Sequence, residues 1–328
     1  DMTRETCDTC RFDSDEYTTE DVIGTLLTLE AWWLEAVRDI DPEVLNTRPT
    51  PTVWAPSEYA QHTSGVTWAL TESLEQMRAG PMQRDPIAVP DASADDPPPD
   101  IDTAACITEI GRQAQRMTTI VRELGDDGLQ ALTGQVGDRT IDGAWVVRHA
   151  VHDATHHLSD TGRDLYALVG ASAPPAFGSV ASVNVSDGGV PKRPVSSVRI
   201  GRRGLEGDRQ GTRKHHGRVW QALCLYSIDV IEALREEGHP IEAGSTGENL
   251  TLRGIDWVTM RPGVRLQLGD AVAELTVPAT PCRHNAQWFT DGDFRRMDHA
   301  RYPGWSRWYA KVVRDGEVRE GDQVIVDP

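Results

Sequence analysis

The stretch from Asp142 to Gly170 reads DGAWVVRHAVHDATHHLSDTGRDLYALVG, and its apolar residues recur at the spacing of one long amphipathic helix. His152 and His156 are four residues apart, so both imidazoles leave one face of this helix about one turn apart. Two imidazoles in this arrangement can hold one metal ion. The alternative is that the histidines only pack or face solvent, which is the better interpretation of a single histidine.

Three further helices are predicted before this one, over residues 19–39, 57–77 and 102–124. A loop rich in Pro and Asp, residues 80–100, separates the second from the third. Four helices with one long connection predict a helix bundle. His62 lies in the second helix and can supply a third ligand, and three histidines leave the open coordination position that is typical of a catalytic metal site.

The pattern changes after residues 171–177, which read Ala-Ser-Ala-Pro-Pro-Ala-Phe and form the predicted linker. Strand-like runs follow at 179–185, 197–200, 219–226, 249–252, 264–268 and 272–277, with one helix at 228–237. We therefore predict a multidomain α+β chain. It has an N-terminal segment (1–18), a four-helix bundle (19–172) and a mixed β-barrel domain (177–328).

The 328 residues carry a formal net charge of −18 that is unevenly distributed. Residues 1–172 hold 31 acidic residues against 12 arginines, a net of −19, and residues 173–328 hold 20 against 21 basic ones, a net of +1. The first half therefore repels nucleic acid and anionic membranes, and we expect neither as a partner.

No apolar run approaches the roughly eighteen residues of a membrane span, and the five cysteines are too few for a disulfide scaffold. The N-terminus lacks the apolar core of a signal peptide, so we expect a cytoplasmic protein.

The N-terminal segment contains Cys7-x-x-Cys10. Such a pair can form half of a zinc site or a redox couple. Because only two thiols are present, a closed zinc site would need histidines or another chain. The simpler interpretation is a disordered tail with reduced thiols.

Cys282 is the candidate catalytic residue of the second half, within Pro281-Cys282-Arg283-His284-Asn285 after the predicted strand 272–277. Neighbouring cations favour the thiolate, the form that attacks electrophiles or ligates metals. A free cysteine is more often a buried core residue, and Cys106 and Cys224 on apolar segments fit that interpretation. The proline and polar neighbours of Cys282 argue against it.

The segment Trp54-Ala-Pro-Ser-Glu-Tyr-Ala-Gln-His62, taken with His152-Asp-Ala-Thr-His156-His157-Leu-Ser-Asp, resembles the DinB-like bundle family. That family includes thiol-dependent S-transferases and the N-terminal domain of maleylpyruvate isomerase. The resemblance covers residues 17–170 and implies a divalent metal (Zn, Ni or Fe) on His62, His152 and His156. The ligands alone do not choose among these metals. The resemblance also implies a low-molecular-weight thiol, such as mycothiol, as a partner.

An ordered series of motifs spans the second half. It comprises Gly189-Val-Pro-Lys192-Arg193-Pro194, Gly204-Leu-Glu-Gly207-Asp208-Arg209, His215-His216-Gly217, Gly247-Glu248-Asn249-Leu250, Leu268-Gly269-Asp270, Pro281-Cys282 and Gly304-Trp305. This series resembles the MOSC domain, most closely its YiiM-like branch, from about Ser179 onward. The chain departs from the family pattern at His216-Gly217-Arg218 and Gln221-Ala222-Leu223, where many members have His-Gly-Gly and Lys-Ala-Val. The resemblance implies either a molybdenum cofactor (Mo-pterin) pocket or a persulfide carrier centred on Cys282. Basic residues near the thiol suit a pterin phosphate, and polar residues in motif positions can orient the cofactor. The candidate cofactor-binding residues are Lys192, Arg193, Asp208, Arg209, His216, Asn249 and Arg283. The alternative is that about half of the basic residues form a solvated surface that offsets neighbouring acids.

Three functions follow from these resemblances. The leading one is a molybdenum-cofactor enzyme that reduces a small N-hydroxylated or N-oxide substrate with electrons from a partner protein. The second is a sulfurtransferase that carries a persulfide on Cys282, supplied by a sulfur-donor protein and unloaded by a small thiol activated at the bundle metal. The third is a metal-binding or sensing module without turnover.

Overall fold

The computed structural model describes residues 4–86, 92–93, 96–97, 99–169, 177–210 and 217–327. The chain divides into two compact units, residues 1–169 and 170–328, which are described separately below. The predicted linker at 171–177 lies almost wholly outside the described residues.

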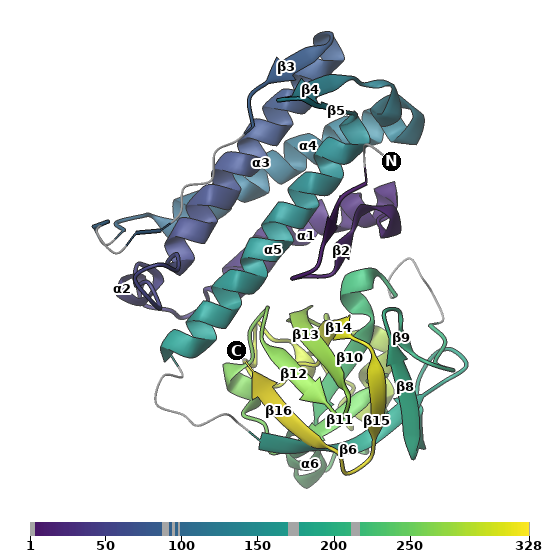
Figure 1. Cartoon of the computed structure of the whole chain (residues 1–328). Coiled ribbons are helices and arrows are strands. Elements are labelled where there is room, and N and C mark those ends of the chain that lie inside the picture. The colour runs from purple at the N-terminus through teal and green to yellow at the C-terminus, as the bar shows by residue number, and fades with distance from the viewer. Residues whose placement is uncertain are drawn as a thin grey trace. The chain divides into compact units, whose positions relative to one another are not determined.

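The first unit is a four-helix bundle (Figure 1), which confirms the predicted class. Its long helices are α1 (Thr19–Ala36), α3 (Pro56–Ala79), α4 (Thr103–Ala131) and α5 (Gly143–Val169), with a short α2 at Pro42–Leu45. Helix α3 packs against α4 and α5, and α1 packs against the same two helices. Thr18 and Asp21 form a capping box that begins α1. Helix α4 extends past the predicted end and kinks at Gly125, where φ is 63°, a conformation that favours glycine.

Each long helix contributes a fully buried side chain to the core of the bundle. Trp33 of α1, Leu74 of α3, Met117 of α4 and Leu165 of α5 all have 0% exposure. Their positions follow the apolar periodicity that predicted the helices, because a helix in a bundle must bury one apolar stripe.

Two small strand groups complete the first unit. Strands β3 (Met82–Arg84), β4 (Gly134–Val136) and β5 (Arg139–Ile141) form one sheet, so the predicted loop at 80–100 begins with a strand. Strands β1 (Thr6–Cys7) and β2 (Phe12–Asp13) form an antiparallel hairpin. The interpretation of a disordered tail is therefore wrong. Cys10 and Phe12 are buried, and the Phe12 ring stacks on His152 with centroids 4.3 Å apart.

The second unit is a mixed β-barrel, as predicted. Its strands are β6 (Phe177–Val185), β7 (Arg193–Val195), β8 (Ser197–Gly201), β9 (Gly204–Leu205), β10 (Leu223–Ser227), β11 (Leu250–Arg253), β12 (Arg265–Leu268), β13 (Ala271–Pro278), β14 (Trp308–Arg314), β15 (Gly316–Arg319) and β16 (Gln323–Asp327). One helix, α6 (Ile228–Glu236), joins β10 to its parallel neighbour β11.

Seven strands close the barrel in the order β11-β10-β14-β13-β12-β16-β6, and β6 pairs back onto β11. All of these pairs are antiparallel except β10 with β11, which makes the barrel mixed. Strand β7 extends the sheet beyond β6, and β15, β8 and β9 form a separate sheet (Figure 1). The barrel interior is apolar, with Leu225, Leu250, Leu266 and Trp308 at most 1% exposed. The run predicted as one strand at 219–226 begins instead with a 3₁₀ turn at Val219–Gln221.

No helix among the described residues has the length and apolarity that crossing a membrane requires.

Because each unit has its own buried core, we expect fragments 1–172 and 177–328 to fold separately. Each fragment should show native-like circular dichroism and one cooperative thermal transition. A fragment ending at residue 150 is the matched control. It loses Leu158 and Leu165 from the core of the bundle, so it should not unfold cooperatively. Two unfolded fragments, 1–172 and 177–328, would contradict this division.

Candidate metal and cofactor sites

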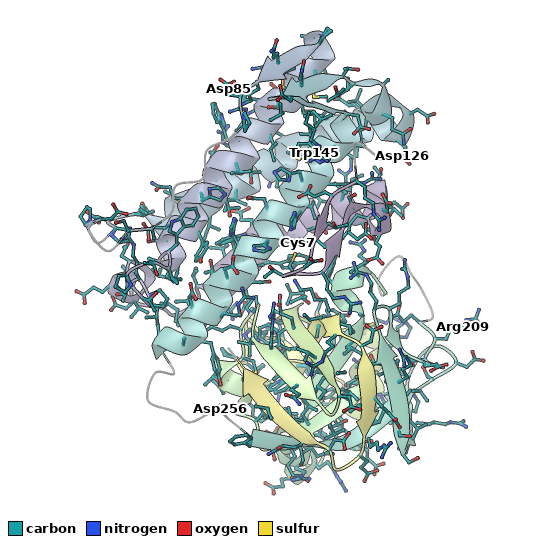
Figure 2. The ribbon with its side chains drawn as sticks, in the orientation of Figure 1. Cys7, Asp85, Asp126, Trp145, Arg209 and Asp256 are labelled. Atoms are coloured by element: carbon teal, nitrogen blue, oxygen red, sulfur yellow. The ribbon has the colours of Figure 1, made fainter. Side chains whose placement is uncertain are left out.

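The N-terminal hairpin brings two thiols to two histidines of helix α5. The ligand atoms of Cys7, Cys10, His152 and His156 all lie within 4.8 Å of one another. Cys10 Sγ is 3.4 Å from His152 Nε2, and Cys7 Sγ is 3.8 Å from His156 Nδ1. Figure 2 labels Cys7 on the hairpin beside α5. The pair of histidines predicted from the i, i+4 spacing therefore comes together, and the Cys-x-x-Cys motif joins it.

The far nitrogens of both histidines face carboxylates. His152 Nδ1 lies against Glu5, which is also 2.9 Å from His149 Nδ1, and His156 Nε2 is 3.5 Å from an oxygen of Asp160. Burial opposes ionisation of Glu5, but its hydrogen bonds with His149 and His152 outweigh this and lower its pKa to about 2. Burial likewise opposes charge on His152, whose contacts with Cys10 and Glu5 raise its pKa to about 10.

A second cluster lies one residue further along α5. His62 Nε2 of α3 is 3.3 Å from Asp153 Oδ1, and His157 Nε2 is 3.6 Å from the same oxygen. Burial raises the pKa of Asp153, but the hydrogen bond with His62 and the nearby histidines lower it on balance. The second oxygen of Asp153 is buried, and no described residue forms a hydrogen bond with it. The three residues form a group able to hold a metal ion.

The structure thus separates the predicted ligands His62, His152 and His156 into two groups. Neighbouring residues of a helix are rotated by about 100°, so the pair 152/156 and the pair 153/157 leave α5 on different sides. His152 and His156 face the hairpin, whereas Asp153 and His157 face His62 of α3. Sequence reasoning missed Asp153 and His157, although their i, i+4 spacing was visible in the sequence.

The His62 cluster adjoins a cavity of about 280 Å³ in the same unit. The cavity is lined by Arg48, Trp54, Glu58, Gln61, His62, Ala92 and Asp96. Arg48 and Glu58 form an ion pair of 2.6 Å on its wall. A metal ion on His62, Asp153 and His157 would have an open position, because three protein ligands do not complete a tetrahedral site.

The barrel unit contains a larger cavity of about 410 Å³. It is lined by Ser186, Gly189, Val190, Lys192, Arg209, Gln210, Gln221, Cys224, Thr246, Gly247, Asn249, Cys282, His284, Asn285, Gln287, Arg307 and Tyr309. Cys224 of β10 and Tyr309 of β14 are cross-strand partners, so the strand pairing fixes both on this wall. The half-buried Cys282 follows β13.

One wall of this cavity is an ordered polar network. The ammonium of Lys192 is 2.5 Å from Asp208 Oδ2, and Asn249 Nδ2 donates to the same oxygen at 2.9 Å. The side chains of Lys192 and Asp208 are only 9% and 4% exposed. Asn249 Oδ1 also accepts from the backbone N–H of Cys224, which ties the network to β10.

Three buried polar atoms around the cavity have no hydrogen-bond partner among the residues that the structure describes. They are Arg307 Nε, Asn285 Nδ2 and Gln221 Oε1. Arg307 is 6% exposed, and its other nitrogens donate to the carbonyls of Thr246 and Thr280. Because buried polar groups are normally paired, these two donors and one acceptor fit a polar ligand, and the Arg307 guanidinium favours an anionic group on it.

Of the residues predicted from the sequence, Lys192, Arg209, Asn249 and Cys282 line the cavity. Asp208 is not a lining residue, but it accepts hydrogen bonds from the lining residues Lys192 and Asn249. Arg193 and Arg283 are exposed and are not among the lining residues, and His216 lies outside the described residues. The Arg209 side chain is 76% exposed and points outward from the barrel unit (Figure 2). Arg307 and Asn285 were missed, because nothing in their local sequence shows that they are buried at the cavity. Gln221 was noted only as a departure from the MOSC pattern, and that departure was the signal that could have pointed to it.

Both units of the chain match models of known protein families. Residues 26–160 match the model of the DinB superfamily, and residues 212–325 match that of the MOSC domain. The chain therefore carries a DinB-like helical region followed by a MOSC domain, in the arrangement that the sequence predicted.

Individual relatives match only parts of the chain. The uncharacterized protein YflK of Bacillus subtilis (strain 168) is 30% identical over 135 residues, which cover 40% of this chain and 60% of YflK. Protein YiiM of Escherichia coli (strain K12) is 28% identical over 119 residues, 35% of this chain and 52% of YiiM. The chain thus spans a little over half the length of these curated relatives.

Two solved structures are each similar to part of the chain. YiiM from Geobacillus stearothermophilus is 23% identical with a TM-score of 0.38, covering 46% of this chain and 75% of its own. YfiT from Bacillus subtilis, described as a probable metal-dependent hydrolase with an unusual four-helix bundle topology, is 15% identical with a TM-score of 0.39. That match covers 46% of this chain and 87% of YfiT.

We expect iodoacetamide to alkylate Cys282 at least about tenfold faster than Cys224. Cys282 is half-buried, whereas Cys224 is 6% exposed and burial raises the pKa of its thiol, which lowers the thiolate fraction. Peptide mass spectrometry of the full chain, sampled over time, measures both rates. Equal rates would contradict the difference in environment.

Asp208→Asn should destabilise the barrel unit by about 3 kcal/mol, because it leaves the Lys192 ammonium buried without its carboxylate. Urea unfolding of the full chain measures this change. The matched control is Asp187→Asn, which removes an exposed carboxylate 3.7 Å from Arg209 and should have no measurable effect. Equal stability of both variants would show that the Lys192–Asp208 pair is not structurally important.

Proposed function

We propose that the barrel cavity binds the molybdenum cofactor and that the protein reduces a small N-hydroxylated or N-oxide substrate. The observation that carries this proposal is a half-buried thiol, Cys282, on a cavity with three buried polar atoms that have no hydrogen-bond partner within the described part of the chain. These atoms are Arg307 Nε, Asn285 Nδ2 and Gln221 Oε1. MOSC domains are generally associated with this cofactor. When bound, it supplies two-electron redox chemistry.

The residues present fit the cofactor in charge and in hydrogen-bonding capacity. Arg307 and Lys192 are cations on the wall and can pair with a pterin phosphate. Asn285 Nδ2 can donate to a pterin acceptor and Gln221 Oε1 can accept from a pterin N–H. The Cys282 thiolate is a soft ligand of the kind that suits molybdenum.

The reaction needs a partner for its electrons. Reduction of an N–OH group to N–H consumes two electrons and two protons and releases one water. The electrons come from a donor protein, which we propose as a partner. The polar network of Lys192, Asp208 and Asn249 then acts as a rigid wall that holds the cofactor in position.

A divalent metal on His62, Asp153 and His157 is the second part of the proposal. The adjoining 280 Å³ cavity is suited to a small molecule such as a low-molecular-weight thiol, whose sulfur would take the open coordination position. This replaces the set of ligands inferred from the sequence with the set that the structure brings together.

Molybdenum analysis tests the main proposal. Protein expressed with intact cofactor biosynthesis should contain close to one molybdenum per chain and reduce an N-oxide with a reduced viologen dye as electron source. Cys282→Ser should lose both properties, whereas Cys106→Ser, a change in the helical unit, should keep both.

Two other outcomes would overturn the proposal. Molybdenum-free wild-type protein that gains one sulfur atom on Cys282, by intact mass under non-reducing conditions, would establish sulfur transfer instead. Protein with neither molybdenum nor added sulfur would point to a binding or sensing module.

A further inference from the structure

We infer that Cys7, Cys10, His152 and His156 form a closed zinc site that fastens the N-terminal hairpin to helix α5. The four ligand atoms come from only two elements and already lie within 4.8 Å of one another. Two thiolates and two imidazoles are a ligand set that zinc prefers, and four protein ligands leave no open position.

The measured separations match those of a tetrahedral zinc site. With Zn–S near 2.3 Å and Zn–N near 2.0–2.1 Å, a sulfur and a nitrogen ligand should lie about 3.5 Å apart. The observed distances are 3.4 Å for Cys10 Sγ to His152 Nε2 and 3.8 Å for Cys7 Sγ to His156 Nδ1. Cys7 and Cys10 are not joined in a disulfide in the structure, so both sulfurs can act as thiolate ligands.

The surroundings of the histidines supply an independent argument. A metal-bound imidazole normally donates its other N–H to a carboxylate, which fixes the tautomer and the ring orientation. His152 presents Nε2 to Cys10 and Nδ1 to Glu5, and His156 presents Nδ1 to Cys7 and Nε2 to Asp160. Both rings are therefore oriented as zinc ligands with a carboxylate behind each of them.

The position of the site explains why a hairpin with strands of only two residues is ordered. Hairpins of this size are at most marginally stable alone. Cys10 is 8% exposed and Phe12 stacks on His152, so the metal would lie between the hairpin and the helix. Binding replaces the protons of two thiols and of any charged imidazole and changes no oxidation state.

Cobalt substitution tests the site in the full chain, because cobalt(II) bound to thiolates gives an intense charge-transfer absorption that oxygen and nitrogen ligands do not give. Wild-type protein purified under reducing conditions should show this absorption with tetrahedral visible bands, and zinc should displace the cobalt. Cys10→Ser should weaken the absorption and reduce the zinc affinity by more than about hundredfold. Glu5→Gln should reduce the zinc affinity by roughly 10–100-fold. Cys106→Ser is the matched cysteine control and should change nothing.

The second cluster provides the discriminating control. His62→Ala should leave the thiolate absorption intact, because His62 belongs to the group with Asp153 and His157. If Cys10→Ser does not fold, alkylation of wild-type protein decides the matter: Cys7 and Cys10 should be protected with zinc and react once a chelator removes it. A wild-type spectrum without a thiolate band, or a Cys7–Cys10 disulfide in reduced preparations, would overturn the inference.

Discussion

The rotation of about 100° between neighbouring residues of helix α5 determines which side chains of the first unit can act together. His152 and His156 meet the thiols of the hairpin, while Asp153 and His157, each one position further on, meet His62 of α3. A single helix thereby presents two adjacent groups of different chemistry. One is closed and rich in sulfur, and the other has three ligands beside a cavity.

Asp160 lies behind both groups. Its Oδ2 is 3.5 Å from His156 Nε2 and 3.1 Å from His157 Nδ1. Burial raises the pKa of Asp160, but its hydrogen bond with His157 and the charges nearby hold it below the ordinary value, so the carboxylate is the stable form. The two groups consequently share one negative charge, and a change in either histidine alters the field at the other.

The sequence was sufficient to predict the helix bundle, the β-barrel and their order along the chain, because apolar periodicity and ordered glycine motifs reflect local structure directly. It also singled out His152 and His156, which the structure brings together, and Cys282, Lys192 and Asn249, which line the barrel cavity. It grouped His62 with His152 and His156, whereas the structure places His62 beside Asp153 and His157. Spacing within a helix does not reveal which neighbouring helix a face contacts. The sequence did not predict Arg307 and Asn285 as cavity residues, because their burial depends on segments distant in the chain. It also did not predict that Cys7 and Cys10 contact helix α5, because that contact depends on a hairpin whose strands have only two residues each.

Closure of the barrel has a consequence for synthesis on the ribosome. Strand β6 is the first barrel strand to emerge, yet it pairs with β11 and with β16, which begins only at Gln323. Translation proceeds at roughly 5–20 residues per second, so the edges of β6 stay without these partners for on the order of ten seconds. Only the short pairing with β7 can form sooner. Every helix of the first unit, by contrast, has been translated by residue 169. Unpaired strand edges attract other strands, so the barrel is the part of the nascent chain that needs shielding from its neighbours on a polysome.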